Sequence, residues 1–373
     1  HFAAYGLKLM ERQTYQFREM DLGKLLHAVL RAYSEVVRTS YQNDWAAVPE
    51  EKRSALCGAL VDTLTPRLQS EILLSRDNYR HLKQRIRATA ERTVSHLSAW
   101  AAFSRFQPAF FEEPFGHASD SVQLTPLQLG EGYALSFKGQ IDRLDLHTSD
   151  RYFLIIDYKT GAAAINLFDV YYGLRLQLLV YMMVGQILLH QKGDDRIPAG
   201  MLYSLVRNPI VDAGNKRLSA GQLADKIKAA LRMPGWVLAD IEVAKAIDSS
   251  FAFIKPSVKK SDGGFTKTSK DSGYIRTQKE FELMMAYVDC ILRDTGKAIL
   301  DGDIRIRPYR EGQKNACTFC PYADVCGFDL NLAGYAYRDI EKESDARIER
   351  KMIERTGRED LRDAIHTSAA KGD

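Results

Sequence analysis

Residues 139–161, GQIDRLDLHTSDRYFLIIDYKTG, contain two strand-like segments that each carry an acidic residue. From Tyr133 to Asp142 apolar and polar residues alternate, which predicts a strand with one buried and one polar face. The segment 152–157, YFLIID, is almost continuously apolar and predicts a strand covered on both faces. A turn through HTSDR would join the two strands and bring Asp142 and Asp157 to the same edge of a sheet.

The segments around these strands alternate between helical and extended patterns. Apolar residues recur every three or four positions from Asp21 to about Arg38, where Asp21 is expected to cap the helix, and helical patterns continue from about 50 to 104. Residues 170–190 predict a strongly apolar helix, and residues 200–211 predict another strand. This order predicts an α/β core behind a helical front.

We expect five segments along the chain. They are a helical segment at 1–105, an α/β core at 106–254, a flexible loop rich in Ser, Lys and Gly at 255–274, a helix and Cys-rich segment at 275–330, and an exposed, charged helical tail at 331–373.

Composition limits the class of protein without naming a function. A formal net charge of +4 is too small to establish nucleic-acid binding, although it allows a local basic groove. The most apolar stretch, 178–189, is shorter than the roughly 20 residues that cross a bilayer, and the first residues do not have the pattern of a signal peptide. We therefore expect no membrane segment and a cytoplasmic protein. Because the chain does not begin with Met, we expect it to be part of a longer one.

The acidic strand ends have the composition of a metal site. Residues two apart on a strand project to the same face, so Asp157 and Lys159 are expected side by side, with Cα atoms roughly 6.5 to 7 Å apart. If the strand that carries Asp142 lies alongside, two carboxylates and the backbone carbonyl of Tyr158 provide hard oxygen ligands suited to Mg²⁺. The lysine would then hold or deprotonate a nucleophile near the ion.

The competing interpretation is an ordinary ion pair at a strand end, in which Asp142 is paired with Arg143 or Arg151. The second carboxylate on the same side and the Gly-rich segment that follows Lys159 favour the metal site.

Three of the five cysteines, Cys317, Cys320 and Cys326, have the spacing C-x₂-C-x₅-C. Thiolates at this spacing can hold three corners of a zinc ion or an iron–sulfur cluster, and either centre needs a fourth ligand. Cys57 and Cys290 are possible fourth ligands on chemistry alone, but we expect both to be plain thiols on helices.

The motifs GQID and DYKTG, followed by a helix with Gln177 and Tyr181, resemble those of the RecB-like branch of the PD-(D/E)XK nuclease superfamily. The resemblance implies a restriction-endonuclease-like core, in which helices flank a mixed central sheet. It also implies that Asp142, Asp157, Lys159, Gln177 and Tyr181 form the catalytic group.

The same resemblance implies an upstream histidine in a helix and a glutamate before the first core strand. His27 in DLGKLLHAVL matches the histidine, and Glu112 in FFEEPFG fits the pattern of the glutamate better than Glu113. The implied metal ligands are His27, Glu112, Asp142, Asp157 and the carbonyl of Tyr158. The chain departs from the family at Gln140, where an arginine is usual.

Three further segments, YGLKLMER, WVLADIEVAKAID at 236–248 and GDIRIRPYREGQKNACTFCPYADVCGFD, are similar to the nuclease domains of AddB-type subunits of bacterial helicase-nucleases. This similarity implies a [4Fe-4S] cluster held by the three late cysteines and a fourth that lies upstream of this sequence. It also implies single-stranded DNA as the substrate, an AddA-type helicase-nuclease as the partner, and a role in double-strand break resection and recombinational repair.

Two other functions are compatible with these motifs. A degenerate nuclease fold could serve only to grip DNA or a partner subunit, and a stand-alone iron–sulfur nuclease of the Cas4 kind could carry the same cysteines. The basic face of Arg80, Lys83 and Arg87 predicts either a solvated helix surface or a contact with DNA phosphates.

Overall fold

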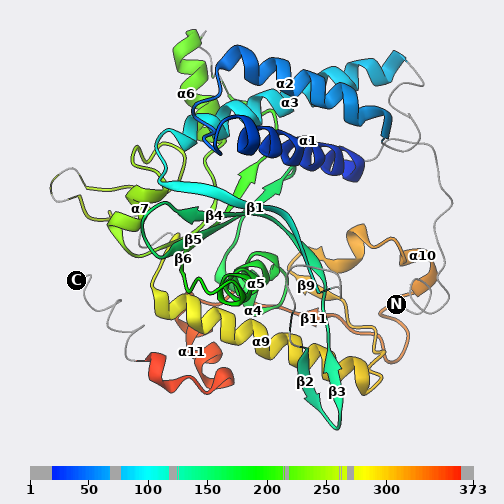
Figure 1. Ribbon diagram of the computed structural model, residues 1–373. Helices are drawn as coiled ribbons and strands as arrows, with labels where there is room; N and C mark the ends of the chain where they lie inside the picture. The colour runs from blue at the N-terminus through cyan, green and yellow to red at the C-terminus, as the bar shows by residue number, and fades with distance from the viewer. Residues whose placement is uncertain are drawn as a thin grey trace.

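The computed structural model describes residues 19–67, 77–116, 124, 126–212, 214, 218–259, 261, 263–266 and 273–362. Figure 1 shows a central sheet with α1, α2 and α3 on one side and α4, α5, α9 and α11 on the other. The helices are α1 Glu19–Ser40, α2 Glu50–Leu64, η2 Thr65–Arg67, α3 Asp77–Ala101, α4 Leu167–Tyr171, α5 Gln177–Gln191, α6 Ala220–Ala230, α7 Ile241–Ile247, α9 Gln278–Leu300, η4 Ala316–Phe319, α10 Ala323–Cys326, α11 Asp345–Thr356 and η5 Glu359–Leu361.

The central sheet has six strands in the order β1-β4-β5-β6-β7-β8. The pairs β5–β6 and β7–β8 are parallel, and the other neighbouring pairs are antiparallel. These strands are β1 Phe106–Phe115, β4 Gly139–His147, β5 Tyr152–Lys159, β6 Ile197–Leu205, β7 Gly235–Leu238 and β8 Ile275–Arg276. The expected α/β fold, with a mixed sheet flanked by helices and a helical N-terminal part, is confirmed.

The alternating pattern from Tyr133 to Asp142 is divided between two sheets rather than forming one strand. Its first part is β3 Tyr133–Leu135, which pairs with β2 Leu127–Gly130 in a separate hairpin. Its second part begins β4, which pairs with β1 along its whole length and continues to His147. By contrast β5 lies between β4 and β6, as its continuous apolar sequence predicted.

The apolar segment 170–190 forms two helices instead of the single predicted one. Gly173 adopts a positive φ of 75° after the end of α4, a conformation that costs glycine little, and α5 begins at Gln177. Within α5, a Cβ atom at Gly185 would lie 3.0 Å from Leu144 Cδ1, so the glycine lets this helix approach the sheet closely. The break therefore places Gln177 at the first turn of a helix that is buried against β4, β5 and β6.

The N-terminal helices cover the other face of the sheet. The apolar stripe of α1 is buried, as its period predicted, while Asp21 lies inside the helix rather than at its cap. Its buried members are Leu25, Leu26, Val29, Leu30, Tyr33 and Val37. Across the residues that the structure describes, no helix is both long and apolar enough to cross a membrane.

The charged tail is less exposed than its sequence suggested. Helix α11 packs against α9 and α4, and its residues Ile348, Met352 and Ile353 are buried.

A small three-stranded sheet surrounds the segment that carries η4. Two of its strands, β9 Tyr309–Glu311 and β10 Lys314–Asn315, precede η4, and the third is β11 Arg338–Asp339.

A buried ion pair lies where the N-terminal helices meet the sheet. Arg143 donates two hydrogen bonds to Asp145, from Nε to Oδ1 at 2.6 Å and from Nη2 to Oδ2 at 2.7 Å, and both side chains are almost fully buried. The guanidinium carbon lies 5.0 Å from the ring centroid of Trp45 and 5.4 Å from that of Trp100. The pair thereby fixes β4 against two aromatic side chains of the helical layer.

Asp145→Ala should destabilise the protein by about 3–5 kcal/mol, because it leaves the Arg143 charge buried without its partner. Urea unfolding measures this change. As a matched control, Glu242→Ala breaks the exposed Lys245–Glu242 ion pair and should cost less than about 1 kcal/mol. Equal losses in the two variants would show that the buried pair contributes no more than a surface pair.

Candidate active site

Three carboxylates lie level with one another on the neighbouring strands β1, β4 and β5. The β1–β4 ladder pairs the residues on either side of Glu112 with those on either side of Asp142. The β4–β5 ladder pairs Arg143 with Ile156, so that the next residues outward, Asp142 and Asp157, lie opposite each other. Residues opposite each other on adjacent strands project to the same face of a sheet. The strand register therefore gathers Glu112, Asp142 and Asp157 into one row.

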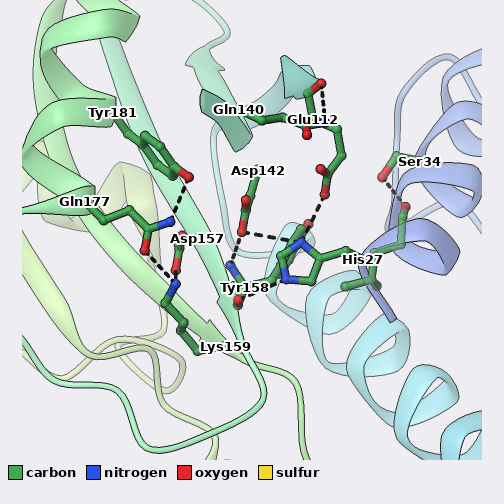
Figure 2. A network of polar contacts seen from close by, with 11 residues as sticks. His27, Ser34, Glu112, Gln140, Asp142, Asp157, Tyr158, Lys159, Gln177 and Tyr181 are labelled. Atoms are coloured by element: carbon green, nitrogen blue, oxygen red, sulfur yellow. Dashed lines mark hydrogen bonds and ion pairs between the residues drawn. The ribbon is translucent and has the colours of Figure 1, made fainter. Parts of the chain in front are cut away.

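Glu112 has a backbone conformation that is unusual for a non-glycine residue. Its φ is 48°, in the left-handed region, where such a side chain is strained. The side-chain amide of Gln140 donates to the Glu112 carbonyl at 2.9 Å, while the carboxylate turns toward His27 (Figure 2). Gln140, which the sequence marked only as a departure from the family pattern, thus holds the glutamate in place.

His27 projects from α1 toward the row and contacts Glu112, Asp142 and the backbone carbonyl of Tyr158. Its Nδ1 lies 3.1 Å from Glu112 Oε1 and 3.7 Å from Asp142 Oδ2, and its Nε2 lies 3.2 Å from the carbonyl oxygen of Tyr158. Burial lowers the pKa of His27, but the hydrogen bond to Glu112 and the charges of Asp142 and Glu112 outweigh it and raise the pKa overall. The positive form of the ring is favoured because acceptors surround it.

Both aspartates of the site are buried. Asp142 is 7% exposed and Asp157 is completely buried. Burial, and next the charge of Asp157, raise the pKa of Asp142 to about 7, and burial also raises the pKa of Asp157. The backbone N–H of Tyr158 donates to Asp142 Oδ2 at 2.8 Å. The fold thus holds the two carboxylates close together, although burial and mutual repulsion disfavour their ionised forms.

A chain of polar contacts leads from Asp157 to α5. Lys159 Nζ lies 2.7 Å from Asp157 Oδ2 and donates to Gln177 Oε1 at 2.8 Å. Gln177 Nε2 in turn donates to the Tyr181 hydroxyl at 2.7 Å (Figure 2). Gln177 and the lysine are accessible to solvent, whereas Tyr181 is buried. The structure therefore brings together every residue that the sequence proposed for the catalytic and metal-binding groups.

The competing ion-pair interpretation of Asp142 is wrong. Arg143 is bound to Asp145 in the core, and Arg151 Nε donates to the backbone carbonyl of Asp195. The nearest cationic partner of Asp142 in the described structure is the His27 ring. The carboxylate thus faces the site without an arginine.

The site fits a divalent cation. His27, Glu112 and Asp142 each offer a ligand atom, and these atoms all lie within 4.8 Å of one another; no other group of this kind occurs among the described residues. Both carboxylate oxygens of Asp157 are shielded from solvent; among the described residues Oδ1 has no hydrogen-bond partner of regular geometry, while Oδ2 lies beside the Lys159 ammonium group. A cation would satisfy those oxygens and offset the repulsion between the carboxylates.

The cysteine motif lies apart from this site, after α9. Cys317 belongs to η4, Cys320 follows it, and Cys326 ends α10. All three are free and partly exposed. Burial raises the pKa of the Cys57 thiol in α2 to about 12 and also raises that of Cys290 in α9. A raised pKa suits an unreactive thiol better than a metal ligand, which binds as the thiolate.

The basic face of α3 is largely neutralised on the surface. Lys83 Nζ lies 2.6 Å from Asp62 Oδ1, and Arg87 Nε lies 2.9 Å from Glu91 Oε1. The side chain of Arg80 lies outside the described part of the structure. The two paired cations favour a solvated helix face.

Comparison with known proteins supports this geometry. Residues 1–327 match the family model of the PD-(D/E)XK nuclease superfamily. A protein of Pelotomaculum thermopropionicum, named as a subunit of an ATP-dependent helicase/deoxyribonuclease, is 34% identical over 360 residues, which cover 94% of this chain and 30% of that protein. A protein of the same name in Heliobacterium modesticaldum is 36% identical over 362 residues, which cover 91% of this chain and 29% of that protein. The chain thus spans about three tenths of the length of these relatives.

Asp142→Asn should raise the melting temperature of the protein in EDTA at pH 8, because it removes a charge that the fold disfavours. Adding Mg²⁺ or Mn²⁺ should raise the melting temperature of the wild type, with a stabilisation of about 2.7 kcal/mol when the ion is at 100 times its Kd, and should leave the variant almost unchanged. Differential scanning calorimetry measures both effects.

Asp225→Asn, an exposed change of the same kind on α6, serves as the control and should respond to the ion as the wild type does. An ion-induced shift that persists undiminished in Asp142→Asn would place the cation elsewhere.

Proposed function

The chain belongs to the PD-(D/E)XK nuclease superfamily, and we propose that it is the nuclease domain of an AddB-type subunit, which hydrolyses phosphodiester bonds of unwound single-stranded DNA with the help of Mg²⁺. The observation that carries this proposal is the row of three carboxylates with Lys159 at its end. A domain that only grips DNA would gain nothing from buried carboxylates, since they repel a phosphate backbone.

In this proposal His27, Glu112, Asp142, Asp157 and the carbonyl of Tyr158 hold the metal. Bound there, magnesium would activate a water molecule and offset the charge that develops on the scissile phosphate. Three oxygen-bearing side chains suit such a hard cation, and the buried position of the aspartates shields their oxygens from water.

The residues at the β5–α5 side of the site orient the reactants. Lys159 extends its ammonium group to the solvent-accessible side, where it can donate to a phosphate oxygen or to the attacking water. Asp157 and Gln177 fix that ammonium group from two sides, and Tyr181 fixes the Gln177 amide. Together these contacts keep the lysine in one position, which is what an in-line attack on phosphorus requires.

The names of the relatives motivate the proposed partners. Each is named as one subunit of an ATP-dependent helicase/deoxyribonuclease. For this chain we accordingly propose DNA as the substrate, an AddA-type helicase-nuclease as the companion that delivers single strands, and a cytoplasmic role in double-strand break resection and recombinational repair.

The cysteine motif completes the proposal. Cys317, Cys320 and Cys326 would bind a [4Fe-4S] cluster together with a fourth ligand. Three free, accessible thiols within ten residues fit such a centre, and a turn with a hydrogen bond from the Cys320 N–H to the Cys317 carbonyl at 3.2 Å keeps the first two close together. Its place after α9 suggests a structural rather than a catalytic role.

The nuclease proposal predicts that Lys159→Ala lowers the rate of Mg²⁺-dependent cleavage of labelled single-stranded DNA by about 10²–10³-fold, because a donor to the developing charge is lost. Asp157→Asn should reduce cleavage to background, since it removes a metal-binding charge from the β5 end of the row. Gel electrophoresis of the products under single-turnover conditions gives the rates.

Lys245→Ala, which removes an exposed lysine of α7, is the matched control and should cleave at the wild-type rate. DNA binding without cleavage by the wild type would favour the degenerate, binding-only fold. Cleavage that is untouched by both site variants would refute the assignment of the site.

The cluster proposal predicts that anaerobically reconstituted protein contains iron and sulfide and absorbs visible light. Cys320→Ala should lower the iron content, while Cys290→Ala should preserve it because that thiol lies on α9, outside the motif. Zinc without iron, or equal losses in the two variants, would contradict the proposed ligand set.

A further inference from the structure

A cavity opens beside the row of carboxylates, between α1, α3 and the ends of β5 and β6. Its volume is about 210 Å³, and its walls come from α1, α3 and the segments that directly follow β5 and β6. Helices α1 and α3 lie on the same side of the sheet (Figure 1). In α/β folds, ligands bind preferentially at the carboxyl ends of parallel strands, and β5 and β6 are parallel neighbours.

The cavity adjoins the catalytic group directly. Thr160 in its wall follows Lys159, and Leu26 in its wall precedes His27. Val206, a third wall residue, donates its N–H to the Lys159 carbonyl at 2.9 Å. A DNA strand with one phosphate at the carboxylates and its path directed toward α1 and α3 would place a neighbouring nucleotide at this opening.

The surface of the cavity is divided into an apolar floor and a polar rim. The partly exposed Leu22 and Leu82 form the accessible part of the floor, which the buried Leu26, Ile86 and Val206 support from below. At the rim the Asn208 side-chain amide donates to the Thr89 hydroxyl at 3.0 Å. Such a surface suits a flat base that inserts its ring and keeps its edge near solvent.

The charge of the rim is positive and not neutralised. Arg85 and Arg207 are the charged residues of the cavity wall, and neither forms an ion pair with the described residues. The Nε of Arg207 is shielded from solvent and lacks a hydrogen-bond partner there. By contrast Lys83 and Arg87, on either side of Arg85 in α3, are paired with acidic side chains. The cavity therefore offers two guanidinium groups that can bind an anion.

We propose that this cavity is a subsite for the nucleotide next to the scissile phosphate, in which the floor holds the base and Arg85 and Arg207 bind the adjoining backbone phosphate. The subsite rests on the proposed nuclease function, because it takes its ligand from the strand that the carboxylates cut. Guanidinium groups bind phosphate through two parallel hydrogen bonds. The floor has no polar group with which to select a particular base, so the subsite accepts any base sequence.

The charge of the subsite is tested with the double variant Arg85→Gln/Arg207→Gln and a fluorescein-labelled oligo(dT) in EDTA. Anisotropy titrations should show an affinity at least about tenfold lower than that of the wild type. The slope of log K against log salt should become less steep by about 0.7, since the two arginines bind one phosphate and each phosphate contact on a single strand contributes about 0.7.

The matched control is Lys83→Gln/Arg87→Gln, which removes the same total charge but from paired residues on either side of Arg85 in α3. This control should keep the affinity and slope of the wild type to within about twofold. Equal losses of affinity in the two double variants would mean that the effect depends only on the total charge, and would contradict the proposed subsite. Melting temperatures of both variants check that they fold.

The base-binding floor is tested without mutation by an oligonucleotide of the same length that carries abasic sites throughout. The wild type should bind it more weakly than oligo(dT) with the same salt slope, because the phosphates remain and the base is absent. Equal affinities would overturn the role of the floor.

Cleavage assays separate this inference from the proposed function. If the wild type cleaves in Mg²⁺ but the subsite variant matches its control in both affinity and KM, the subsite is wrong and the nuclease proposal survives. If the binding differences hold but no cleavage occurs under any condition, the nuclease proposal fails and the cavity stands as a strand-binding site.

Discussion

The register of three neighbouring strands determines what this site can do. Because β1, β4 and β5 are antiparallel neighbours, one alignment places Glu112, Asp142 and Asp157 in a row, and a shift of one residue in either ladder would send a carboxylate to the opposite face. The buried Arg143–Asp145 pair lies one strand position further along β4 and anchors that strand to the helical layer. Catalytic geometry and core packing are therefore set by the same strand.

The row concentrates negative charge where water is scarce, and the surrounding residues compensate for it from opposite sides. His27 approaches from α1, and Lys159 approaches from the end of β5. The raised pKa values of both aspartates measure the remaining cost, which a divalent cation would offset. A site of this kind is less stable than a neutral core would be, in keeping with the exchange of stability for function that active sites often show.

Much of the fold, together with the strand positions of Asp142, Asp157 and Lys159, followed from the sequence because it depends on local periodicity. The burial of α1 and β5 follows from spacings of three to four residues and from a continuous apolar run, and the adjacency of Asp157 and Lys159 follows from the strand period of two. The placement of His27 and Glu112 came instead from family resemblance, since no local rule brings residues 85 positions apart into contact.

What the sequence did not predict depends on contacts between distant segments. The alternation from Tyr133 could not show that its first residues pair with β2 and its later ones with β1. The positive φ of Glu112 and its support by Gln140 arise only when two strands meet. The cavity beside Lys159 likewise exists only because α3 crosses near the ends of β5 and β6.

The central claim is that the carboxylate row acts as one cation site, and the position of a bound metal tests it most directly. A crystal of the protein soaked in Mn²⁺ should give an anomalous scattering peak within about 2.0–2.6 Å of oxygens from Asp142 and Asp157, with His27 or Glu112 in the same coordination shell. An ordered Mn²⁺ bound elsewhere, with no peak between these two aspartates, would contradict the account.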